Sequence, residues 1–294
     1  LRTHSVHIFY NLHMHNVAQI PSIQLSALQK WWSTHSQASL ALHIKYTPQC
    51  DSTNVQLCHS PHQHNTLLVA EHQTHGRGQF ERTWVSGTGD LMFSLGLLLP
   101  PSSVPALSLR VGLALAQVCA VHGWHVQLKW PNDVIATHPD TGQRGKLVGI
   151  LVQNQTADDG EHAWVVIGVG VNIGTRLLPN TSDASAFPPI GLAQLDETWI
   201  QPVSHQREDL IMQIVDTILV HIETASAAPD EQLARTWNGH DLWHGCRLIA
   251  TEPSGHRHTG LGCGVNADGA YQVDINGETR SFYSAQLRPA TEPA

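Results

Sequence analysis

The residues best suited to chemistry lie in a glycine-containing stretch, residues 70–84 (AEHQTHGRGQFERTW). A short apolar run that is typical of a strand comes directly before it. Gly76 and Gly78 allow backbone amides to approach an anion closely, and Arg77 and Arg82 add two guanidinium groups. Such a loop suits a phosphate or a carboxylate, although the same composition also occurs in plain solvated connections.

Further polar residues stand where predicted elements begin or end. The tetrapeptide 51–54 (DSTN) follows a predicted strand and is typical of a helix N-cap, and its hydroxyls and amide also suit a polar ring or an anion. Asn132 and Asp133 follow a strand that Pro131 ends, where polar residues converge on ligands. Lys146 heads a strong strand, a pattern that by itself favours a surface lysine whose stem covers apolar residues over a site residue.

Strong helix and strand patterns separate these polar residues and must position them. Apolar residues at helical spacing predict helices over 21–37, 107–122, 204–226 and a shorter segment ending near 237. Bulky and alternating runs predict strands over 41–46, 90–99, 126–130, 145–152 and 163–173. Gly168 and Gly170 inside the last strand indicate a close approach of a backbone or a ligand. A Pro- and Ser-rich loop is predicted over 176–202.

The pattern changes after Trp243 to short runs separated by glycine turns. These predicted strands cover 246–250, 259–265, 270–275 and 279–283. Asp268-Gly269 and Asn276-Gly277 are hairpin signals. We predict a small antiparallel barrel that leans on the main domain, because so short a unit is near the lower limit for independent folding.

Composition limits the classes of function. The chain has 294 residues, of which 41% are hydrophobic and 14% charged, so we expect a globular protein of one large domain or two unequal ones. The formal net charge of −8, with 21 histidines counted as neutral, argues against a nucleic-acid partner or an acidic membrane surface. Apolar runs are too short to cross a bilayer, and the opening residues lack the apolar segment of a signal peptide.

The cysteines and histidines bear on the cellular compartment and on a possible metal site. Five scattered cysteines fit reduced thiols in a cytosol, so we expect a cytoplasmic protein. The chain opens on Leu1, and Met14 is an alternative natural start. A metalloprotein is the alternative suggested by the histidines, but none of them forms a helical pair with an acidic third ligand. The histidines considered were His4, His7, His13, His15, His59, His62, His64, His72 and His75.

Five segments, in this order and spacing, resemble the motif series of the biotin protein ligases. They are DSTN (51–54), AEHQTHGRGQFERTW (70–84), KWPNDV (129–134), KLVGILV (146–152) and GVGVNI (168–173). The resemblance runs from about residue 44 to residue 173. The C-terminal hairpin region resembles the small SH3-like barrel of that family.

The resemblance implies an α/β (α+β) fold like that of class II aminoacyl-tRNA synthetases and biotin ligases, with a mainly antiparallel mixed sheet and flanking helices. The domains expected are an N-terminal extension with one helix (1–39), a catalytic domain (40–240) and an SH3-like C-terminal domain (241–294). Repressor members carry a winged helix-turn-helix before the catalytic domain, and the extension expected here is too short and not basic enough for one.

The resemblance also implies a reaction. Biotin protein ligases join the biotin carboxylate to the α-phosphate of ATP, with Mg²⁺, and release pyrophosphate. The biotinyl-5′-adenylate then acylates a lysine of a biotin carboxyl carrier protein, here expected to be the acetyl-CoA carboxylase subunit. Because two anions meet in the first step, the site needs cations. Homodimers are common in the family.

Site residues are carried over position by position. Those matching catalytic positions are Lys146, Arg77 and Asp133, the last also a candidate Mg²⁺ ligand and proton acceptor. Those matching biotin-binding positions are Ser52, Thr53, Asn54, Gln73, Gly76, Arg77, Gly78, Gln79, Lys146 and Gly149. Those matching ATP-binding positions are Arg77, Arg82, Trp84, Lys129, Asn132, Asp133 and Asn172.

Two positions depart from the family pattern. Gln79 stands where an arginine is common and therefore brings no charge, which predicts weaker retention of the intermediate. Glu81 stands where glycine is common, so it restricts the loop backbone and places an anion near the phosphates. Both departures put efficiency in doubt more than identity.

Two alternative functions remain. A lipoate or octanoate ligase would share the core fold, but the KWPND and GRG motifs favour biotin. A noncatalytic biotin-binding protein would require loss of Lys146 or Asp133, and both are present.

Overall fold

The computed structural model describes residues 20–60, 64–79, 82–174, 187–203, 205–225 and 231–290. The predictions for Glu81, for the first part of the 176–202 loop and for four of the histidines before residue 19 lie outside the described residues, as does the prediction for His62.

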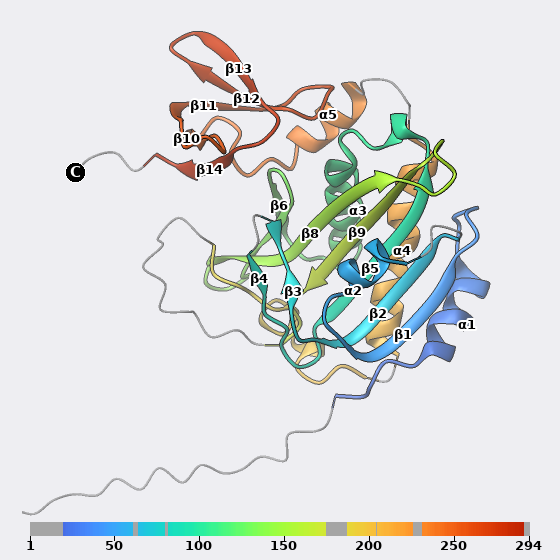
Figure 1. The fold of residues 1–294 in the computed structure, drawn as a ribbon. Helices are drawn as coiled ribbons and strands as arrows, with labels where there is room; N and C mark the ends of the chain where they lie inside the picture. Colours follow the sequence, from blue (N-terminus) through green and yellow to red (C-terminus); the bar gives the residue numbers. More distant parts are fainter. Residues whose placement is uncertain are drawn as a thin grey trace, which may run out of the picture.

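A seven-stranded mixed sheet forms the centre of the molecule (Figure 1). Its strand order is β1-β2-β5-β9-β8-β7-β6, and only β1 and β2 run parallel. The strands are β1 (His43–Cys50), β2 (Thr66–Gln73), β5 (Leu91–Leu99), β6 (Val126–Lys129), β7 (Asp133–Thr137), β8 (Arg144–Thr156) and β9 (Ala163–Val171). The prediction of a mainly antiparallel mixed sheet is therefore confirmed. Strand β7 was not predicted, because Pro131 indicated a strand end and not a tight turn between two strands.

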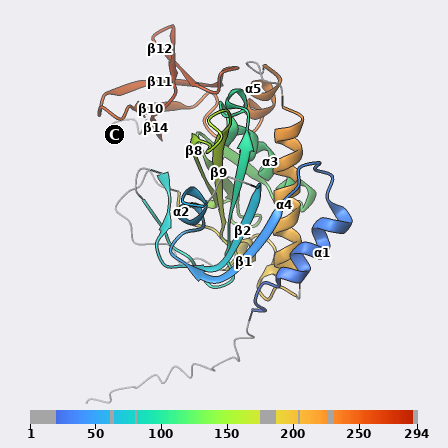
Figure 2. The same ribbon diagram turned by 45° about the vertical axis from the view of Figure 1, so that its right-hand side comes forward.

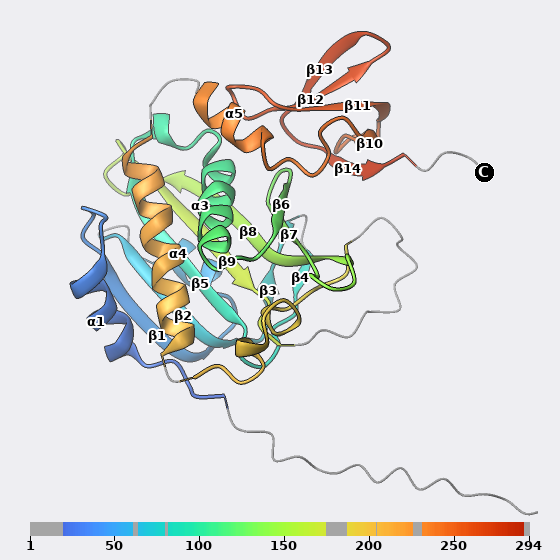
Figure 3. The same ribbon diagram turned by 180° about the vertical axis from the view of Figure 1, so that it is seen from behind.

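Helices cover the two faces of this sheet unequally (Figures 1 and 3). Helices α3 (Leu107–Val121) and α4 (Gln206–Glu223) pack on one face, as their aliphatic spacing predicts. Of the described α-helices, only the short α2 (Thr53–Cys58) packs on the opposite face, against β2, β5 and β9. The open face beside α2 is therefore free to carry a site.

The N-terminal helix α1 (Leu25–His35) lies outside α4 (Figure 2). Carboxylates of α4 hold both of its ends. Asp216 accepts hydrogen bonds from the backbone after the helix, at Gln37 (2.9 Å), and Glu208 accepts one before it, from Gln24 (2.7 Å). The predicted extension is thus packed on the domain from residue 20 onward.

A smaller antiparallel sheet follows α5 (Glu231–Asn238). Its order is β13-β12-β11-β10-β14, with β10 (Arg247–Thr251), β11 (Arg257–Val265), β12 (Tyr271–Ile275), β13 (Glu278–Phe282) and β14 (Gln286–Pro289). Positive φ angles at Asn276 (57°) and Gly277 (90°) match the predicted hairpin turn. The described strands form an open sheet, so the small antiparallel unit is confirmed, whereas its closure into an SH3-like barrel stays a prediction.

The small sheet is attached to the strand that carries Lys129. The backbone of Leu128 exchanges hydrogen bonds with His240 (2.7 Å) and Leu242 (2.9 Å). The indole of Trp130 donates to the carbonyl of Gly269 (3.2 Å). These bonds fix the turn between β6 and β7 against the C-terminal sheet.

Two general features complete the description. Among the described residues, no helix combines the length and the apolar character needed to cross a membrane. The five cysteines, all in the described ranges, are free thiols.

Candidate active site

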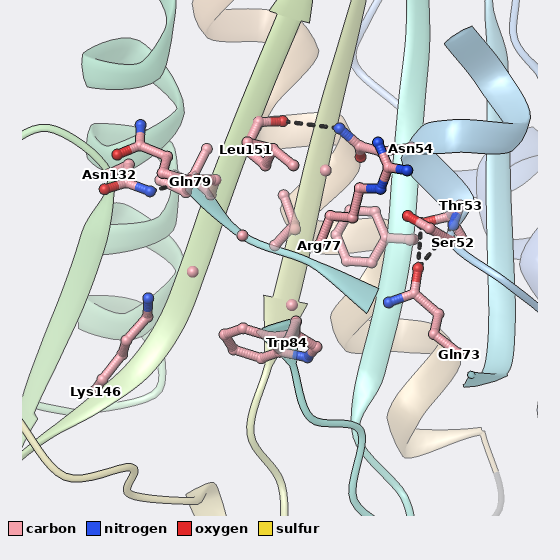
Figure 4. A pocket seen from close by; sticks show the side chains of 17 residues that line it. Ser52, Thr53, Asn54, Gln73, Arg77, Gln79, Trp84, Asn132, Lys146 and Leu151 are labelled. Carbon is pink, nitrogen blue, oxygen red and sulfur yellow. Dashed lines mark hydrogen bonds between the residues drawn. The ribbon is translucent and has the colours of Figure 1, made fainter. Parts of the chain in front are cut away.

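A pocket opens over the glycine-rich middle of β8 and β9, between α2 and the glycine stretch (Figure 4). Predicted site residues from four separate segments line it: Ser52, Thr53, Asn54, Gln73, Arg77, Gly78, Gln79, Trp84, Asn132, Lys146 and Gly149. We call this hollow the inner pocket. Its free volume is about 50 Å³, room for one or two water molecules.

The closed end of the inner pocket is built by hydrogen bonds at the start of α2. Gln73 accepts from the backbone N–H of Thr53 (2.7 Å), which satisfies one of the free donors of the helix N-terminus. Because the Gln73 carbonyl oxygen faces Thr53, its amide nitrogen points toward the pocket (Figure 4). The side chains of Ser52, Thr53 and Asn54 are all at most 3% exposed.

Ser94 joins this group from β5. Its hydroxyl donates to Asn54 Oδ1 (2.6 Å) and lies 2.7 Å from the Thr53 hydroxyl. Asn54 Nδ2 in turn donates to Gln153 Oε1 (3.2 Å) and to the Leu151 carbonyl (3.3 Å). The closed end is therefore a connected network of neutral polar groups.

Three glycines make the floor of the pocket flat. A Cβ at Gly168 would overlap the carboxamide of Asn54, and a Cβ at Gly149 or Gly170 would fall within 2.8 Å of the Trp84 indole. The predicted close approach at Gly168 and Gly170 is thus confirmed, and the approaching groups are side chains of the site itself.

The glycine stretch forms a small hairpin over the pocket. Strand β3 (Gly76–Arg77) pairs with β4 (Thr83–Trp84), and the amide of Gly78 donates to the carbonyl of Arg82 (2.7 Å). Gly76, on the first strand of this hairpin, is buried, and a Cβ there would meet the carbonyl of its strand partner Trp84 at 2.7 Å. Strands of two residues carry too little pattern to be predicted.

The opposite end of the site is charged. Lys146 Nζ lies 2.6 Å from Asp133 Oδ1, and Lys129 Nζ lies 2.9 Å from Asp133 Oδ2. Burial disfavours the charged form of Asp133, but the two ammonium groups outweigh it and hold the pKa of this carboxyl below its usual value. The Lys146 ammonium also lies 5.6 Å from the centroid of the Trp84 ring.

The backbone of Lys146 is held from both sides. Its N–H donates to Pro188 (2.7 Å), and its carbonyl accepts from Ile190 N (3.0 Å) and from Asn172 Nδ2 (2.9 Å). Asn172 is 4% exposed and lies behind the pocket lining. The structure therefore places Asn172 where it orients Lys146, and its direct contact with ATP stays a prediction.

An outer cleft of about 200 Å³ continues from the charged end. Predicted site residues that line it are Gly78, Gln79, Arg82, Trp84, Lys129, Asn132, Asp133 and Lys146. The C-terminal residues Gln286 and Arg288 of β14 form its far wall. Three lysine and arginine groups thus face one cleft in addition to Lys146.

Sequence reasoning missed two parts of the site. Ser94 stands alone as a polar residue in an apolar strand, and that interruption was the available signal. Arg288 lies on a four-residue strand that ends in proline. The sequence pattern therefore predicted neither this strand nor the place of Arg288 at the site.

A metal held by protein ligands alone does not fit these residues. Within the described ranges, no group of three or more His, Cys, Asp and Glu is arranged to bind an ion. Both oxygens of Asp133 face lysines. The role of Asp133 as a Mg²⁺ ligand stays a prediction.

Comparisons with known proteins agree with this geometry. Residues 45–172 match the biotin/lipoate A/B protein ligase family. The chain is 31% identical over 221 residues to the Biotin--[acetyl-CoA-carboxylase] ligase of Mycobacterium tuberculosis, covering 72% of this chain and 74% of that protein. It is 25% identical over 254 residues to the Bifunctional ligase/repressor BirA of Bacillus subtilis, covering 83% and 73%.

Solved structures show the same fold. The biotin protein ligase from Aquifex aeolicus in complex with biotin and ATP superposes with a TM-score of 0.67 at 22% identity, covering 84% of this chain and 99% of that chain. With the 31% identical relative, of which this chain covers 74%, the family follows: this chain belongs to the biotin protein ligases.

Proposed function

We propose that the protein ligates biotin to a lysine of a biotin carboxyl carrier protein, with ATP and through biotinyl-5′-adenylate. The observation that carries the proposal is that the two ends of one continuous site differ in charge. Its closed end is neutral and hydrogen-bonding, and its open end holds Lys129, Asp133 and Lys146. A ligand with a polar uncharged ring and a carboxylate tail matches both ends.

The closed end would hold the ureido ring. Thr53 and Gln73 offer a hydroxyl oxygen and an amide nitrogen, which complement the N–H and C=O groups of a cyclic urea. The glycine floor at Gly149 and Gly170 would lie under the apolar rings. Since the inner pocket has a free volume of about 50 Å³, we expect the β3–β4 hairpin with Arg77 and Trp84 to shift when the ligand enters.

The charged end would carry the first chemical step. The biotin carboxylate attacks the α-phosphate of ATP, and pyrophosphate leaves. Lys146 lies where it can neutralise both reacting anions, while Lys129, Arg82 and Arg288 face the cleft that would take the leaving phosphates. Asp133 keeps both lysine ammonium groups in place until the anions arrive.

In the second step the amine of the carrier lysine would attack the acyl carbon of biotinyl-5′-adenylate, forming the amide and releasing AMP. A groove lined by Gly78, Gln79, Pro131 and Ser284 leads to the hairpin from outside, so a lysine side chain has a route to the adenylate. Its amine must lose a proton before attack. Asp133 can accept that proton only after its lysines have turned to the phosphates, because they lower its pKa.

The finer assignments belong to the same proposal. We propose the acetyl-CoA carboxylase subunit as the carrier, a cytoplasmic location, and a catalytic domain over 40–240 with an SH3-like unit over 241–294. The name of the Mycobacterium tuberculosis relative supports the carrier. The biotin- and ATP-bound Aquifex aeolicus neighbour supports the two substrates.

The test is transfer of labelled biotin to a purified carrier domain with ATP and Mg²⁺. Labelling of the wild-type carrier, and none of a carrier whose acceptor lysine is arginine, is the expected result. Adenylate formation without transfer would contradict the choice of carrier. Absence of adenylate would contradict the function itself.

A further inference from the structure

Ser94 is a buried polar residue that the proposed chemistry does not use. It is fully buried on β5, where its backbone pairs with Leu68 on one side and with Gly168 on the other. All its strand neighbours from Leu91 to Leu99 are aliphatic, aromatic, methionine or glycine. A lone hydroxyl in such a strand is stable only if its hydrogen bonds are made.

Its bonds have a fixed direction. The hydroxyl carries one proton, which it donates to Asn54 Oδ1 (2.6 Å), an atom that can only accept. At the contact between the two hydroxyls (2.7 Å) Thr53 is then the donor, and the same Thr53 proton also faces Gln73 Oε1 (3.1 Å), so the two acceptors share it. Because Thr53 uses its only proton in these contacts, its hydroxyl can only accept a hydrogen bond from a ligand.

The same bonds hold Asn54 in a single orientation. Its Oδ1 is bound by Ser94 and its Nδ2 by Gln153 and by the Leu151 carbonyl. Gly168 is required beneath it, because a Cβ there would overlap the carboxamide. Asn54 therefore acts as a support between α2 and the sheet, which the hydroxyl of Ser94 keeps in place.

The closed end thus offers one acceptor, at Thr53, and one donor, at Gln73 Nε2. A ring with adjacent N–H and C=O groups satisfies both. An aliphatic acyl chain would leave both without partners, and burying unpaired polar groups is costly. Discrimination between these ligand classes therefore depends on the network that orients Thr53.

We propose that Ser94 is a positioning residue that sets the preference of the pocket for a hydrogen-bonding ring over an aliphatic acyl chain. The inference rests on the proposed biotin ligase function. It assigns a specificity role to a residue that does not line the pocket.

Two substitutions test it. Ser94→Ala removes the hydroxyl, and Ser94→Cys keeps the shape with a weak donor. Thr66→Val is the matched control, since it removes a buried hydroxyl from the adjacent strand β2 at a position that donates only to the nearby His64 carbonyl (2.9 Å). Dissociation constants for biotin and for octanoate are measured by calorimetry, with the KM for ATP and kcat measured in parallel.

We expect Ser94→Ala and Ser94→Cys to bind biotin about tenfold more weakly, because a factor of ten in affinity corresponds to the loss of about one hydrogen bond. Octanoate binding should stay within twofold. The KM for ATP and kcat should also stay within twofold. Ser94→Thr, which keeps a hydroxyl, should bind biotin as tightly as the wild type. Thr66→Val should match the wild type. Should Ser94→Ala fail to fold, Ser94→Cys carries the same comparison.

Two results would overturn the inference alone. One is biotin binding that does not change in the Ser94 variants, and the other is equal weakening of biotin, octanoate and ATP, which would indicate general loosening. Wild-type protein that binds octanoate or nothing in place of biotin would overturn the proposed function and this inference together.

Discussion

The two ends of the site differ in how they are built. At the closed end, Thr53, Asn54 and Ser94 are at most 3% exposed and bond to one another as neutral groups. At the charged end, the side chain of Lys146 is 30% exposed and that of Asp133 13%, and charges face a wide cleft. Recognition is therefore placed where water is excluded, and chemistry where a nucleotide and a second protein can enter.

The contrast predicts that substitutions at the two ends change different kinetic constants. Substitutions at the closed end should weaken biotin binding. Substitutions at the charged end should slow adenylate formation or weaken ATP binding.

The largest effect is expected for Lys146→Ala. Loss of the cation facing both reacting anions should slow adenylate formation by about 10²–10³-fold while biotin affinity changes only a few-fold. Single-turnover adenylate formation and calorimetry measure the two quantities. Lys45→Ala, an exposed lysine on the far edge strand β1 of the same sheet, is the control. A loss confined to biotin binding would contradict the separation of the two ends.

Gly168→Ala should be the most damaging change at the closed end. The added methyl group would displace the carboxamide of Asn54, so we expect biotin to bind at least about tenfold more weakly and the free energy of unfolding to fall by about 1–3 kcal/mol. Gly174→Ala, where the nearest atom is the Thr88 carbonyl oxygen at 3.7 Å, should do neither. Equal effects of the two substitutions would contradict the requirement for glycine beneath Asn54.

Asp133→Asn should lower stability in a pH-dependent way. Removing the anion leaves two lysine ammonium groups unopposed, which should cost about 2 kcal/mol at pH 7. Because the pKa of Asp133 is lower in the folded state, its contribution is present above its unfolded value near 3.9 and is lost as the pH falls through its folded value. Urea unfolding at pH 7 and at steps below pH 4 should show the difference shrinking. If the difference in unfolding free energy between the wild type and Asp133→Asn does not change with pH, the ion pairs of Asp133 do not stabilise the fold.

The smallest effect is expected at the C-terminal sheet. The hydroxyl of Tyr271 donates to Asp241 (2.8 Å). The two residues on either side of Asp241 bond to the backbone of Leu128, which precedes Lys129 in β6. Tyr271→Phe should cost about 1 kcal/mol of stability and raise the KM for ATP a few-fold, with biotin affinity unchanged. The exposed Tyr283→Phe is the control. A change in biotin affinity would mean that the small sheet acts on the whole cleft.

The two ends also differed in how well the sequence predicted them. At the charged end, polar residues at strand ends marked a candidate site, and the motif resemblance supplied their expected roles. Glycines in β8 and β9 indicated a close approach, and the structure confirms it with Trp84 and Asn54. The strong helix and strand patterns likewise predicted the helices and the strands of the main sheet other than β7.

The closed end depended on contacts between distant residues. Ser94 lies forty residues from Asn54 in the chain, and only folding brings their side chains together. Asn172 was predicted as a nucleotide contact, yet its amide turns to the carbonyl of Lys146. Arg288 reaches the cleft because the small sheet docks on β6, a packing that no local pattern contains.

The most direct test of the account is biotin-dependent exchange of labelled pyrophosphate into ATP. This assay needs no carrier protein and reports the first chemical step alone. We predict that the wild-type protein exchanges label only when biotin is present, and that Lys146→Ala does not exchange. Exchange supported by octanoate or lipoate but not by biotin would contradict the central claim.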